Sequence, residues 1–325
     1  MRILITGVTG RIGANLAKQL VERGHQLRGL VWPRDPRVEN LKKMQVELVE
    51  GSLTDPAVVE QAVEGIEAVY HLGAAFQGGG PFTDEEFFEI NVRGTFNMLE
   101  AVRRVKGMGQ FLFASSDALY DKYVPGGMSA PIDERTPRVP KGAYALTKAL
   151  GEELCNGYWQ GYQVPTTILR FAMVQAVDEI LEFPQFYLSK MKEVHPELTE
   201  LWQGEECAVL LKDQRDRPFK KHIADVRDIV HGCLCALGKE RALGETFQLA
   251  GPRPFTWDEV SYRLAALRDM PHVEAAVRAI PTFYEFNLRK AEEYLGFSPS
   301  YDIVRMMVDA LNYQRGEDIG VLPHG

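Results

Sequence analysis

Short apolar runs alternate with helical patterns through the first 170 residues, and this alternation limits the possible fold more than any other feature of the chain. The apolar runs have the length of strands, and the stretches between them repeat apolar residues at helical spacing. Such an alternation requires crossover connections, which produce a parallel sheet covered by helices. The sequence therefore predicts an α/β fold with a doubly wound parallel sheet. The expected strands are 3–5, 27–31, 46–49, 68–72, 111–114 and 164–169, and the expected helices include 12–21, 56–63, 84–106 and 142–160.

The pattern changes after about residue 170, which predicts a division into two domains. Residues 1–170 form the first domain. Residues 171–222 and 251–325 contain helical patterns separated by prolines and mixed charges, and we expect them to form a smaller, mostly helical C-terminal domain. Residues 223–250 combine a helical pattern with an apolar run, and we expect them to return to the first domain.

Composition and charge exclude several classes of protein. The chain has 325 residues, of which 45% are hydrophobic and 25% charged, as in ordinary globular proteins. Its formal net charge of −8 argues against binding to nucleic acid or anionic membranes. The four cysteines are not accompanied by a Cys or His pair at zinc-ligand spacing, so we expect no metal site and no disulfide framework. No apolar run is long enough for a membrane span and the first residues already form a predicted strand, so we expect a cytoplasmic protein.

Three glycines follow the first predicted strand at the spacing G-x-x-G-x-x-G. They are Gly7, Gly10 and Gly13, and a helical pattern begins directly after them. Glycines at such a turn allow tight turning and close approach to a pyrophosphate, which the N–H groups at the start of the helix can then bind. The turn therefore predicts a dinucleotide-binding site in residues 1–170, and correspondingly a substrate-binding role for the second domain.

The end of the second predicted strand bears on the choice between NAD and NADP. An acidic residue there would bind the 2′-hydroxyl of NAD, but the strand ends at Trp32-Pro33-Arg34, and Asp35 lies slightly beyond the usual place. Arg34 and Arg11 are suited to the 2′-phosphate of NADP, because guanidinium groups pair well with phosphate. The sequence slightly favours NADP over NAD.

A tyrosine and a lysine lie four residues apart on a predicted helix, at Tyr144 and Lys148. Their side chains share one helical face, so the ammonium can stabilise the phenolate and make the tyrosine a better base near neutral pH. Upstream, Ser116 follows an apolar strand, at the edge of the sheet where ligands gather in doubly wound folds. These three residues form a candidate catalytic set.

With these residues the chain resembles the extended short-chain dehydrogenase/reductase family, and within it the NAD-dependent epimerase/dehydratase group. The resemblance implies a Rossmann fold. The matching motifs are Thr6-Gly7-x-x-Gly10-x-x-Gly13, His71-Leu72-Gly73-Ala74-Ala75, Asn91-Val92-Arg93-Gly94-Thr95, Ser115-Ser116 and Tyr144-x-x-x-Lys148. They occur in the family's order and at compatible spacing.

The resemblance implies a role for each matching residue. Tyr144 is the acid/base that exchanges a proton with the substrate hydroxyl, Lys148 lowers its pKa and holds the nicotinamide ribose, and Ser116 orients the substrate oxygen. Asn91 helps to place Lys148, whereas His71 is expected to be a packed strand residue. The implied cofactor contacts are Gly7, Gly10, Arg11, Ile12 and Gly13 at the pyrophosphate, Ser52 and Leu53 near adenine, where the family often has an acid in place of Ser52, and Ala74 and Ala75 along the cofactor.

The substrate side matches the family less well. Asp117 is a candidate substrate contact, but Ala118 follows it where nucleotide-sugar dehydratases carry a second acid, which argues against dehydration. Gln175 stands near the place where nucleotide-sugar enzymes carry an asparagine. The basic segment 215–222, which includes Lys221, either holds a phosphate or carboxylate or is a solvated face. We expect the loop 76–82 to bound the pocket.

These observations predict an NAD(P)-dependent oxidoreductase that exchanges hydride with a secondary alcohol or ketone carbon of a polar substrate, with a sugar derivative as one option. One alternative is a sugar or nucleotide-sugar epimerase that retains its NAD. Another is a non-catalytic dinucleotide-binding sensor, against which the complete set of Ser116, Tyr144 and Lys148 argues. The expected partner is a small-molecule substrate, with no nucleic acid and no membrane, and the resemblance implies a homodimer.

Overall fold

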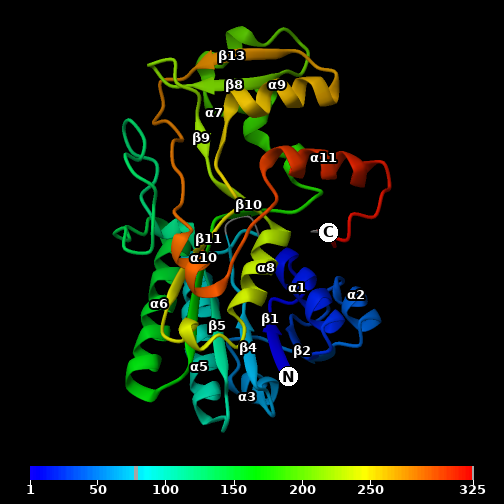
Figure 1. Cartoon of the computed structure of the whole chain (residues 1–325), viewed down its shortest axis with the longest axis vertical. Helices are drawn as coiled ribbons and strands as arrows, with labels where there is room; N and C mark the ends of the chain where they lie inside the picture. The colour runs from blue at the N-terminus through cyan, green and yellow to red at the C-terminus, as the bar shows by residue number, and fades with distance from the viewer. Residues whose placement is uncertain (77–79, 324–325) are drawn as a thin grey trace.

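A seven-stranded parallel sheet forms the larger part of the computed structural model, which describes residues 1–76 and 80–323 (Figure 1). The strand order is β11-β6-β5-β4-β1-β2-β3. The chain builds outward from β1 to one edge and then from β4 to the other, so the order reverses between β1 and β4, where doubly wound sheets bind their ligands. The strands are β1 (Arg2–Thr6), β2 (Gln26–Val31), β3 (Glu47–Glu50), β4 (Ala68–His71), β5 (Gln110–Ser116), β6 (Thr166–Phe171) and β11 (Thr246–Leu249).

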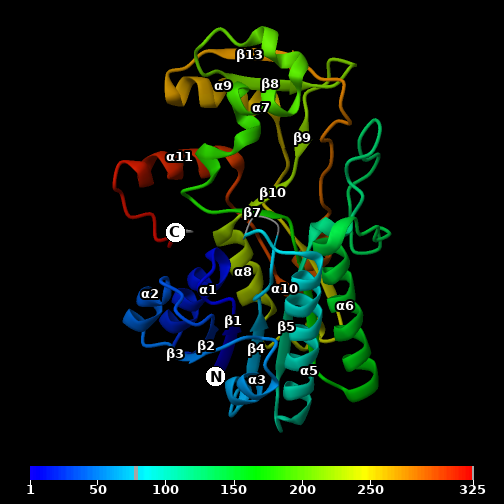
Figure 2. The same ribbon diagram turned by 180° about the vertical axis from the view of Figure 1, so that it is seen from behind.

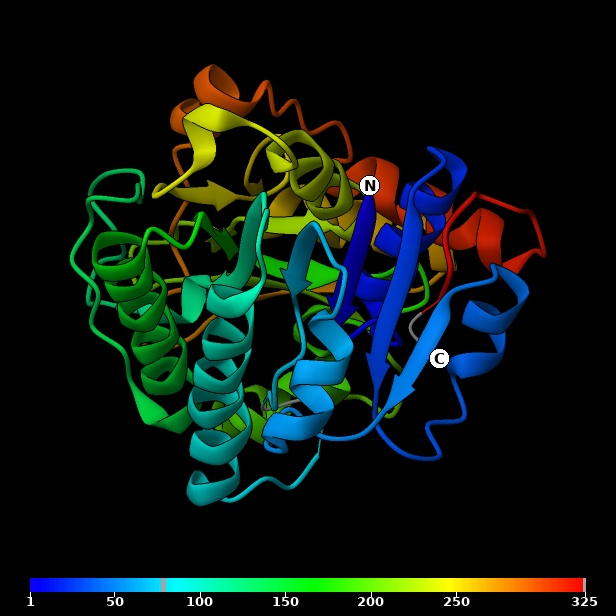
Figure 3. The ribbon, with the colours of Figure 1, turned by 90° about the horizontal axis from the view of Figure 1, so that it is seen from below.

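Helices cover both faces of this sheet, because successive residues of each strand point to opposite sides. Ile3 and Ile5 of β1 belong to the apolar core under α1 and α8, whereas Leu4 belongs to the core under α3, α5 and α6 (Figure 3). The doubly wound α/β prediction is thereby confirmed. The helices of this part are α1 (Arg11–Glu22), α2 (Val38–Lys43), α3 (Pro56–Val63), α4 (Asp84–Phe87), α5 (Gly94–Arg104), α6 (Gly142–Tyr162), α8 (Val226–Ala236) and α10 (Arg289–Leu295), with the π-helical turn η1 (Phe88–Arg93) and the 3₁₀ turns η2 (Asp117–Leu119) and η6 (Glu240–Ala242).

The second part of the chain lies beyond the carboxyl ends of these strands, above the sheet in Figures 1 and 2. It contains helices, as expected, and also a parallel pair of strands, β8 (Ala208–Lys212) and β13 (His272–Ala276). Two short strand pairs lead to it from the sheet: β7 (Met173–Gln175) with β10 (Ile223–Asp225), and β9 (Lys220–Lys221) with β12 (Phe255–Thr256). Its other elements are α7 (Leu188–Val194), α9 (Trp257–Arg268) and α11 (Ile303–Gln314), and the 3₁₀ turns η3 (Ile180–Glu182), η4 (Pro184–Phe186) and η5 (Pro196–Leu201).

One expected helix differs from the structure in its interior. The helix expected over 84–106 is interrupted by the π-helical turn η1. The loop 76–82 that we expected to bound the pocket lies partly outside the described residues. Within the described ranges, no helix combines the length and the apolar character needed to cross a bilayer, and the four cysteines are free thiols.

Candidate functional site

The glycine-rich turn between β1 and α1 has no room for side chains at two of its three glycines. Gly7 has a φ of +69°, and a Cβ atom there would lie 2.7 Å from the backbone nitrogen of Gly73. A Cβ atom on Gly13 would lie 2.2 Å from the carbonyl oxygen of Gly7. The turn is closed by a hydrogen bond from the Gly10 nitrogen to the Gly7 oxygen, 3.1 Å long. These glycines therefore leave bare backbone where a pyrophosphate can approach.

The first turn of α1 is open to an anion. Gly10 caps the helix without a side-chain hydrogen bond, and no acidic residue lies in the first turn. The free N–H groups and the helix dipole favour a phosphate at this point. The expected pyrophosphate contacts Arg11 and Ile12 are the first two residues of this helix. The cradle of bare backbone and the uncapped helix together fit a dinucleotide.

The side chain of Arg11 points to acceptors of the protein itself. Its Nη1 donates to the Val174 carbonyl oxygen at 2.6 Å, and its Nη2 lies 2.7 Å from a carboxylate oxygen of Glu179. Arg11 therefore links the glycine-rich turn to the second part of the chain. This engagement removes one of the two guanidinium groups that led us to favour NADP.

Asp35 lies closer to the glycine-rich turn than its position in the sequence suggested. Its Oδ2 accepts a hydrogen bond of 2.7 Å from Thr9 of the turn, and the Arg37 guanidinium binds both carboxylate oxygens. The Arg37 side chain, more than any other group, lowers the pKa of Asp35 to about 2. The intervening Arg34 adopts a φ of +61° and is exposed, and this turn brings the following carboxylate back toward the sheet edge. A buried carboxylate therefore follows β2, four residues after the last residue of the strand.

The three candidate catalytic residues meet at the carboxyl end of β5. Ser116 ends this strand, and Tyr144 and Lys148 lie one turn apart on α6. The Lys148 side chain is buried, with Nζ donating to the Ala114 carbonyl oxygen at 2.7 Å and lying 5.9 Å from the centroid of the Tyr144 ring. The predicted residues thus come together in one place.

Electrostatics at this place act mainly through burial. Burial raises the pKa of Tyr144 to about 12, a hydrogen bond with Ser116 acts in the opposite direction, and the carboxylate of Asp117 raises the pKa further. Burial also lowers the pKa of Lys148 to about 8. The tyrosine is therefore a protonated phenol at neutral pH.

Asn91 joins two segments of the site from within the π-helical turn η1. Its side chain exchanges two hydrogen bonds with the backbone of Ala75, at 2.8 and 3.0 Å, and donates a third, at 3.0 Å, to the Thr147 hydroxyl. Thr147 precedes Lys148, so Asn91 ties α6 to the segment after β4. A π-helical turn in a longer helix is frequent at functional sites.

His71 is satisfied within the core. Its ring nitrogens lie 2.8 Å from the Thr6 hydroxyl and 3.0 Å from the Thr95 hydroxyl, and burial lowers its pKa to about 3. This agrees with the expectation of a packed strand residue.

The remaining residues expected to contact the cofactor follow strands β3 and β4, and their surroundings differ. Ser52 is engaged in a local turn, with its hydroxyl 2.7 Å from the Thr54 hydroxyl. Leu53 packs against α5, where a Cβ atom on Gly94 would lie 2.8 Å from its own Cβ. Ala74 and Ala75 follow β4, and Ala75 is buried and held by Asn91.

A buried ion pair behind the catalytic residues was not expected from the sequence. Glu152, one turn beyond Lys148 on α6, receives two hydrogen bonds from the Arg170 guanidinium, at 2.8 and 2.7 Å. The Ser115 hydroxyl donates a further bond of 2.6 Å to the same carboxylate. Because Ser115 precedes Ser116, this network fixes α6 to β5 and β6 at the level of the site. The only signal in the sequence was the spacing of four residues between Lys148 and Glu152 on the predicted helix.

The three candidate substrate residues are all buried. The Oδ2 atom of Asp117 lies 2.6 Å from Nζ of the buried Lys122, which no sequence motif singled out. Lys221 is buried in β9, where its Nζ donates to the side chain of Gln185 at 2.9 Å. Gln175 is buried at the end of β7, and its amide nitrogen reaches the carbonyl oxygen of Val174 at 3.3 Å.

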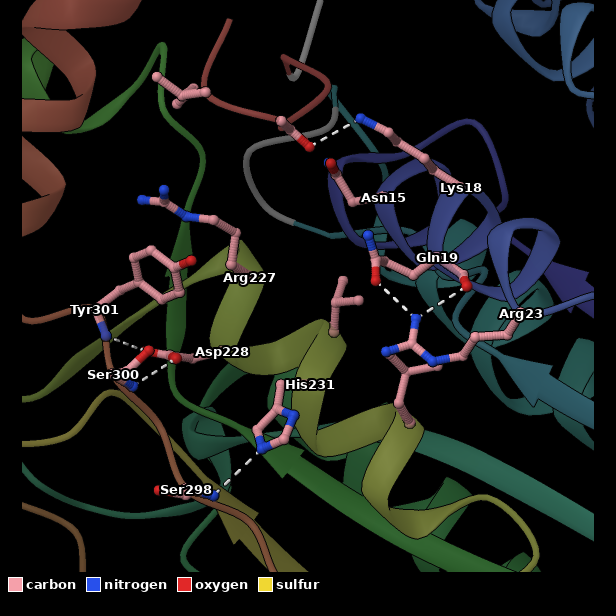
Figure 4. Close-up of a pocket in the computed structure, with 14 residues that line it drawn as sticks. Asn15, Lys18, Gln19, Arg23, Arg227, Asp228, His231, Ser298, Ser300 and Tyr301 are labelled. Carbon is pink, nitrogen blue, oxygen red and sulfur yellow. Dashed lines mark hydrogen bonds between the residues drawn. The ribbon is translucent and has the colours of Figure 1, made fainter.

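A separate pocket lies away from all these residues, between α1 and α8. Figure 4 shows Lys18 of α1 and Arg23, the residue after this helix, on one side and Arg227, Asp228 and His231 of α8 on the other. The cavity has a volume of about 380 Å³. Its lining contains none of the candidate catalytic residues. Among the described residues, no group of three or more His, Cys, Asp or Glu side chains is arranged to hold a metal ion.

Comparisons with known proteins agree with this geometry. A family model described as the NAD dependent epimerase/dehydratase family matches residues 3–250. The chain is 26% identical over 334 residues to a protein of Bacillus subtilis named as an uncharacterized UDP-glucose epimerase, YtcB, with 96% of this chain and 98% of that protein aligned. It is 32% identical over 170 residues to a uronate dehydrogenase of Pseudomonas syringae, which covers 52% of this chain and 58% of that protein. A crystal structure of a short-chain dehydrogenase/reductase superfamily protein from Agrobacterium tumefaciens with bound NAD superposes with a TM-score of 0.85, at 31% identity over 97% of this chain and 98% of that chain.

Proposed function

Since the chain belongs to the NAD-dependent epimerase/dehydratase family and is an enzyme, we propose that it exchanges hydride with a secondary alcohol or ketone carbon of a polar, sugar-derived substrate. The observation that carries the proposal is the convergence of Ser116, Tyr144 and Lys148 at the carboxyl end of β5. A protein that only binds a dinucleotide has no need of this set.

The residues of the chain supply binding, orientation and proton transfer. When bound, the nicotinamide cofactor supplies the hydride chemistry. Tyr144 moves the proton at its phenol oxygen, and Ser116 donates a hydrogen bond to the substrate oxygen. Because the pKa of Tyr144 is about 12 in the free protein, the phenol is ready to act as an acid, and positive charge beside it is needed before it can act as a base. The Lys148 ammonium, held by the Ala114 carbonyl oxygen, supplies such a charge.

We propose NAD as the cofactor, in place of the slight preference for NADP expected from the sequence. The Arg11 guanidinium is bound by Glu179 and Val174, and the Asp35 carboxylate stands at the glycine-rich turn. A carboxylate at the end of the second strand accepts hydrogen bonds from ribose hydroxyls and repels a 2′-phosphate. The bound NAD in the Agrobacterium tumefaciens structure supports this choice.

The test of the mechanism is the variant Tyr144→Phe. It removes the proton carrier and keeps the ring, so we expect the rate of hydride transfer to fall roughly 10²- to 10⁴-fold, measured by nicotinamide absorbance, with NAD affinity unchanged. Tyr162→Phe, on the exposed end of the same helix, is the matched control and should retain full activity. Full activity in Tyr144→Phe would contradict the mechanism.

An epimerase that retains its cofactor is the second candidate. The family and the full-length similarity to the Bacillus subtilis protein named as a UDP-glucose epimerase favour it. The two candidates differ in whether the cofactor leaves after each turnover. Denaturing freshly purified protein and quantifying the released nucleotide distinguishes them, because stoichiometric NAD supports the epimerase and an empty protein supports a dehydrogenase or reductase.

We further propose that the enzyme is a homodimer that pairs through α5 and α6. These helices lie side by side on one face of the sheet (Figure 2). They expose Phe96, Leu146 and Tyr162, the last two by more than half. Apolar side chains gathered on neighbouring helices favour burial against a second copy.

A further inference from the structure

The basic segment 215–222 contains one buried lysine, Lys221, that forms no ion pair with another described residue. Arg217 pairs with Asp213 at 2.9 Å, and Lys220 pairs with Glu285 at 3.2 Å. Lys221 is only 1% exposed, and no carboxylate of the described residues lies within ion-pair distance of it. An isolated buried ammonium is costly, so such a residue either loses its proton or acquires an anion.

The immediate surroundings of Lys221 are neutral. Its Nζ donates to the amide oxygen of Gln185 at 2.9 Å and lies 4.8 Å from the centroid of the Phe183 ring. Burial lowers the pKa of Lys221 to about 7, Lys122 lowers it further, and Asp117 acts in the opposite direction. Lys122 and Asp117 are therefore within electrostatic reach of Lys221.

The pair of Asp117 and Lys122 connects Lys221 to the catalytic residues. Lys122 Nζ lies 2.6 Å from the Asp117 carboxylate and also donates to the Asp117 carbonyl oxygen at 3.0 Å. Asp117 follows Ser116 directly, and its carboxylate also raises the pKa of Tyr144. Lys122 Nζ also lies 5.2 Å from the centroid of the Tyr284 ring, and the Tyr284 nitrogen donates to the Lys220 carbonyl oxygen at 3.1 Å. Strand β9, which carries Lys221, therefore lies close to the pair that follows Ser116. Since the Asp117 carboxylate is already paired with Lys122, it is not free to balance Lys221.

We propose that Lys221, supported by Lys122, binds a carboxylate of the substrate, so that the enzyme acts on a hydroxy acid such as a sugar acid rather than on a neutral sugar. This inference rests on the proposed function, because it assumes that the reacting hydroxyl of the same molecule meets Ser116 and Tyr144. A carboxylate carries a single negative charge, which the ammonium of Lys221 can balance. The side-chain amide of Gln185, beside Lys221, offers a hydrogen-bond donor. A nucleoside diphosphate carries more charge, and Arg217 and Lys220, two further cations of the segment, are already paired within the protein.

The test compares acids with their neutral counterparts in the NAD-loaded protein. The probes are galacturonate, glucuronate and erythronate, matched with galactose, glucose and erythritol, together with galactose 1-phosphate and UDP-glucose. Ligand-dependent shifts of the Tm report binding without turnover, and kcat and KM are measured for each probe that is oxidised. Lys221→Met keeps an apolar stem of similar length in the buried site. Lys220→Met, the preceding residue of β9, is the matched control.

The expected result is a Tm shift with at least one acid that its neutral counterpart does not produce. Lys221→Met should abolish this shift and raise KM for the acid roughly 10- to 100-fold, the range for losing a charged hydrogen bond, with NAD affinity unchanged. Lys220→Met should behave as the wild-type protein. A wild-type protein that responds only to neutral sugars, only to phosphorylated probes or to none overturns the carboxylate assignment, as does an equal loss on acids and neutral sugars in Lys221→Met.

Failure of this inference is distinguishable from failure of the proposed function. If the protein oxidises neutral sugars and loses that activity in Tyr144→Phe, the proposed function stands and the carboxylate site is wrong. If acids shift the Tm in a Lys221-dependent manner while Tyr144→Phe leaves turnover unchanged, the site stands and the mechanism is wrong.

Discussion

Lys148 is a buried cation that lies close to Tyr144, and its burial lowers the free energy of unfolding. Its ammonium is held by one carbonyl oxygen, and burial lowers its pKa to about 8 from the ordinary value near 10.5. Below pH 8 both the folded and unfolded chains carry the proton, and only the folded chain carries the cost of desolvation. Between pH 8 and 10.5 the folded chain releases the proton while the unfolded chain keeps it, so the stability associated with Lys148 rises with pH.

We therefore expect Lys148→Met to stabilise the cofactor-free protein at pH 7 while abolishing activity. The pKa shift, reduced by the lost hydrogen bond, corresponds to a gain of about 2 kcal/mol in the free energy of unfolding. Urea unfolding at pH 7 and pH 9.5 measures it, and the gain should shrink at the higher pH. The exposed Lys106→Met serves as control and should change little at either pH. A variant that is less stable than the wild type at pH 7 would show that the ammonium contributes to folding.

We propose that the choice between NAD and NADP depends on the Asp35 carboxylate, which follows the end of β2. We expect the wild-type protein to bind NAD more tightly than NADP, and Asp35→Asn to reduce this preference roughly 10-fold by removing a charged acceptor and a repulsive charge. Fluorescence titration with both nucleotides measures the ratio.

Asp133→Asn is a matched control for this experiment. Asp133 holds Arg135, two residues later, through the same backbone, Nε and Nη2 contacts by which Asp35 holds Arg37, but it lies outside the glycine-rich turn. The control should keep the preference of the wild type. Tighter binding of NADP by the unmodified protein would restore the preference expected from the sequence.

Among the elements, α6 is placed by charge as well as by apolar packing. Glu152 binds Arg170 of β6 and Ser115 of β5, so one carboxylate sets the helix that carries Tyr144 and Lys148 against the two strands. The pair is almost completely buried. Removing one member of such a pair leaves the other charge without compensation.

We expect Glu152→Gln to lower the free energy of unfolding by about 3 kcal/mol, because Arg170 then remains buried and charged without a carboxylate. Chemical denaturation measures this loss. Glu153→Gln, the next residue on the helix, breaks only the partly exposed ion pair with Arg138 and should cost less than about 1 kcal/mol. Equal effects of the two substitutions would contradict the anchoring role of Glu152.

The elements that carry a strong apolar period were predictable, and those set by tertiary contacts were not. The strands of the large sheet follow from apolar runs such as Phe111 to Ala114, which are buried on both faces. Strand β13, His272–Ala276, escaped prediction because four of its five residues are not buried and its pairing with β8 lies some 60 residues away. The proximity of Ser116, Tyr144 and Lys148 was predictable from their spacing. The pairing of Asp117 with Lys122 and the position of Asp35 depend on turns that no local pattern specifies.

At the scale of the whole molecule, the proposed dimer can be tested through the helices α5 and α6. We expect the wild-type protein to elute with twice the mass of one chain, and the double variant Phe96→Glu, Leu146→Glu to elute as a monomer, because two charges on each face oppose apolar burial. Light scattering coupled to size-exclusion chromatography measures the mass. Val308→Glu, which alters an apolar side chain on α11 whose exposure lies between those of Phe96 and Leu146, should remain a dimer. A monomeric wild-type protein would contradict the proposal.

Strand β11 pairs with β6 at the edge of the sheet, but it is synthesised long after β6. All six residues of β6 are buried, and β11 covers their outer edge only after about 75 further residues have been added. At ribosomal speeds of about 5–20 residues per second, the nascent chain displays an unpaired apolar edge for roughly 4 to 15 seconds. Such an edge is a template for association with other chains, so chaperone engagement should concentrate in this interval. A polypeptide that stops between β6 and β11 should aggregate rather than form an independent cofactor-binding half.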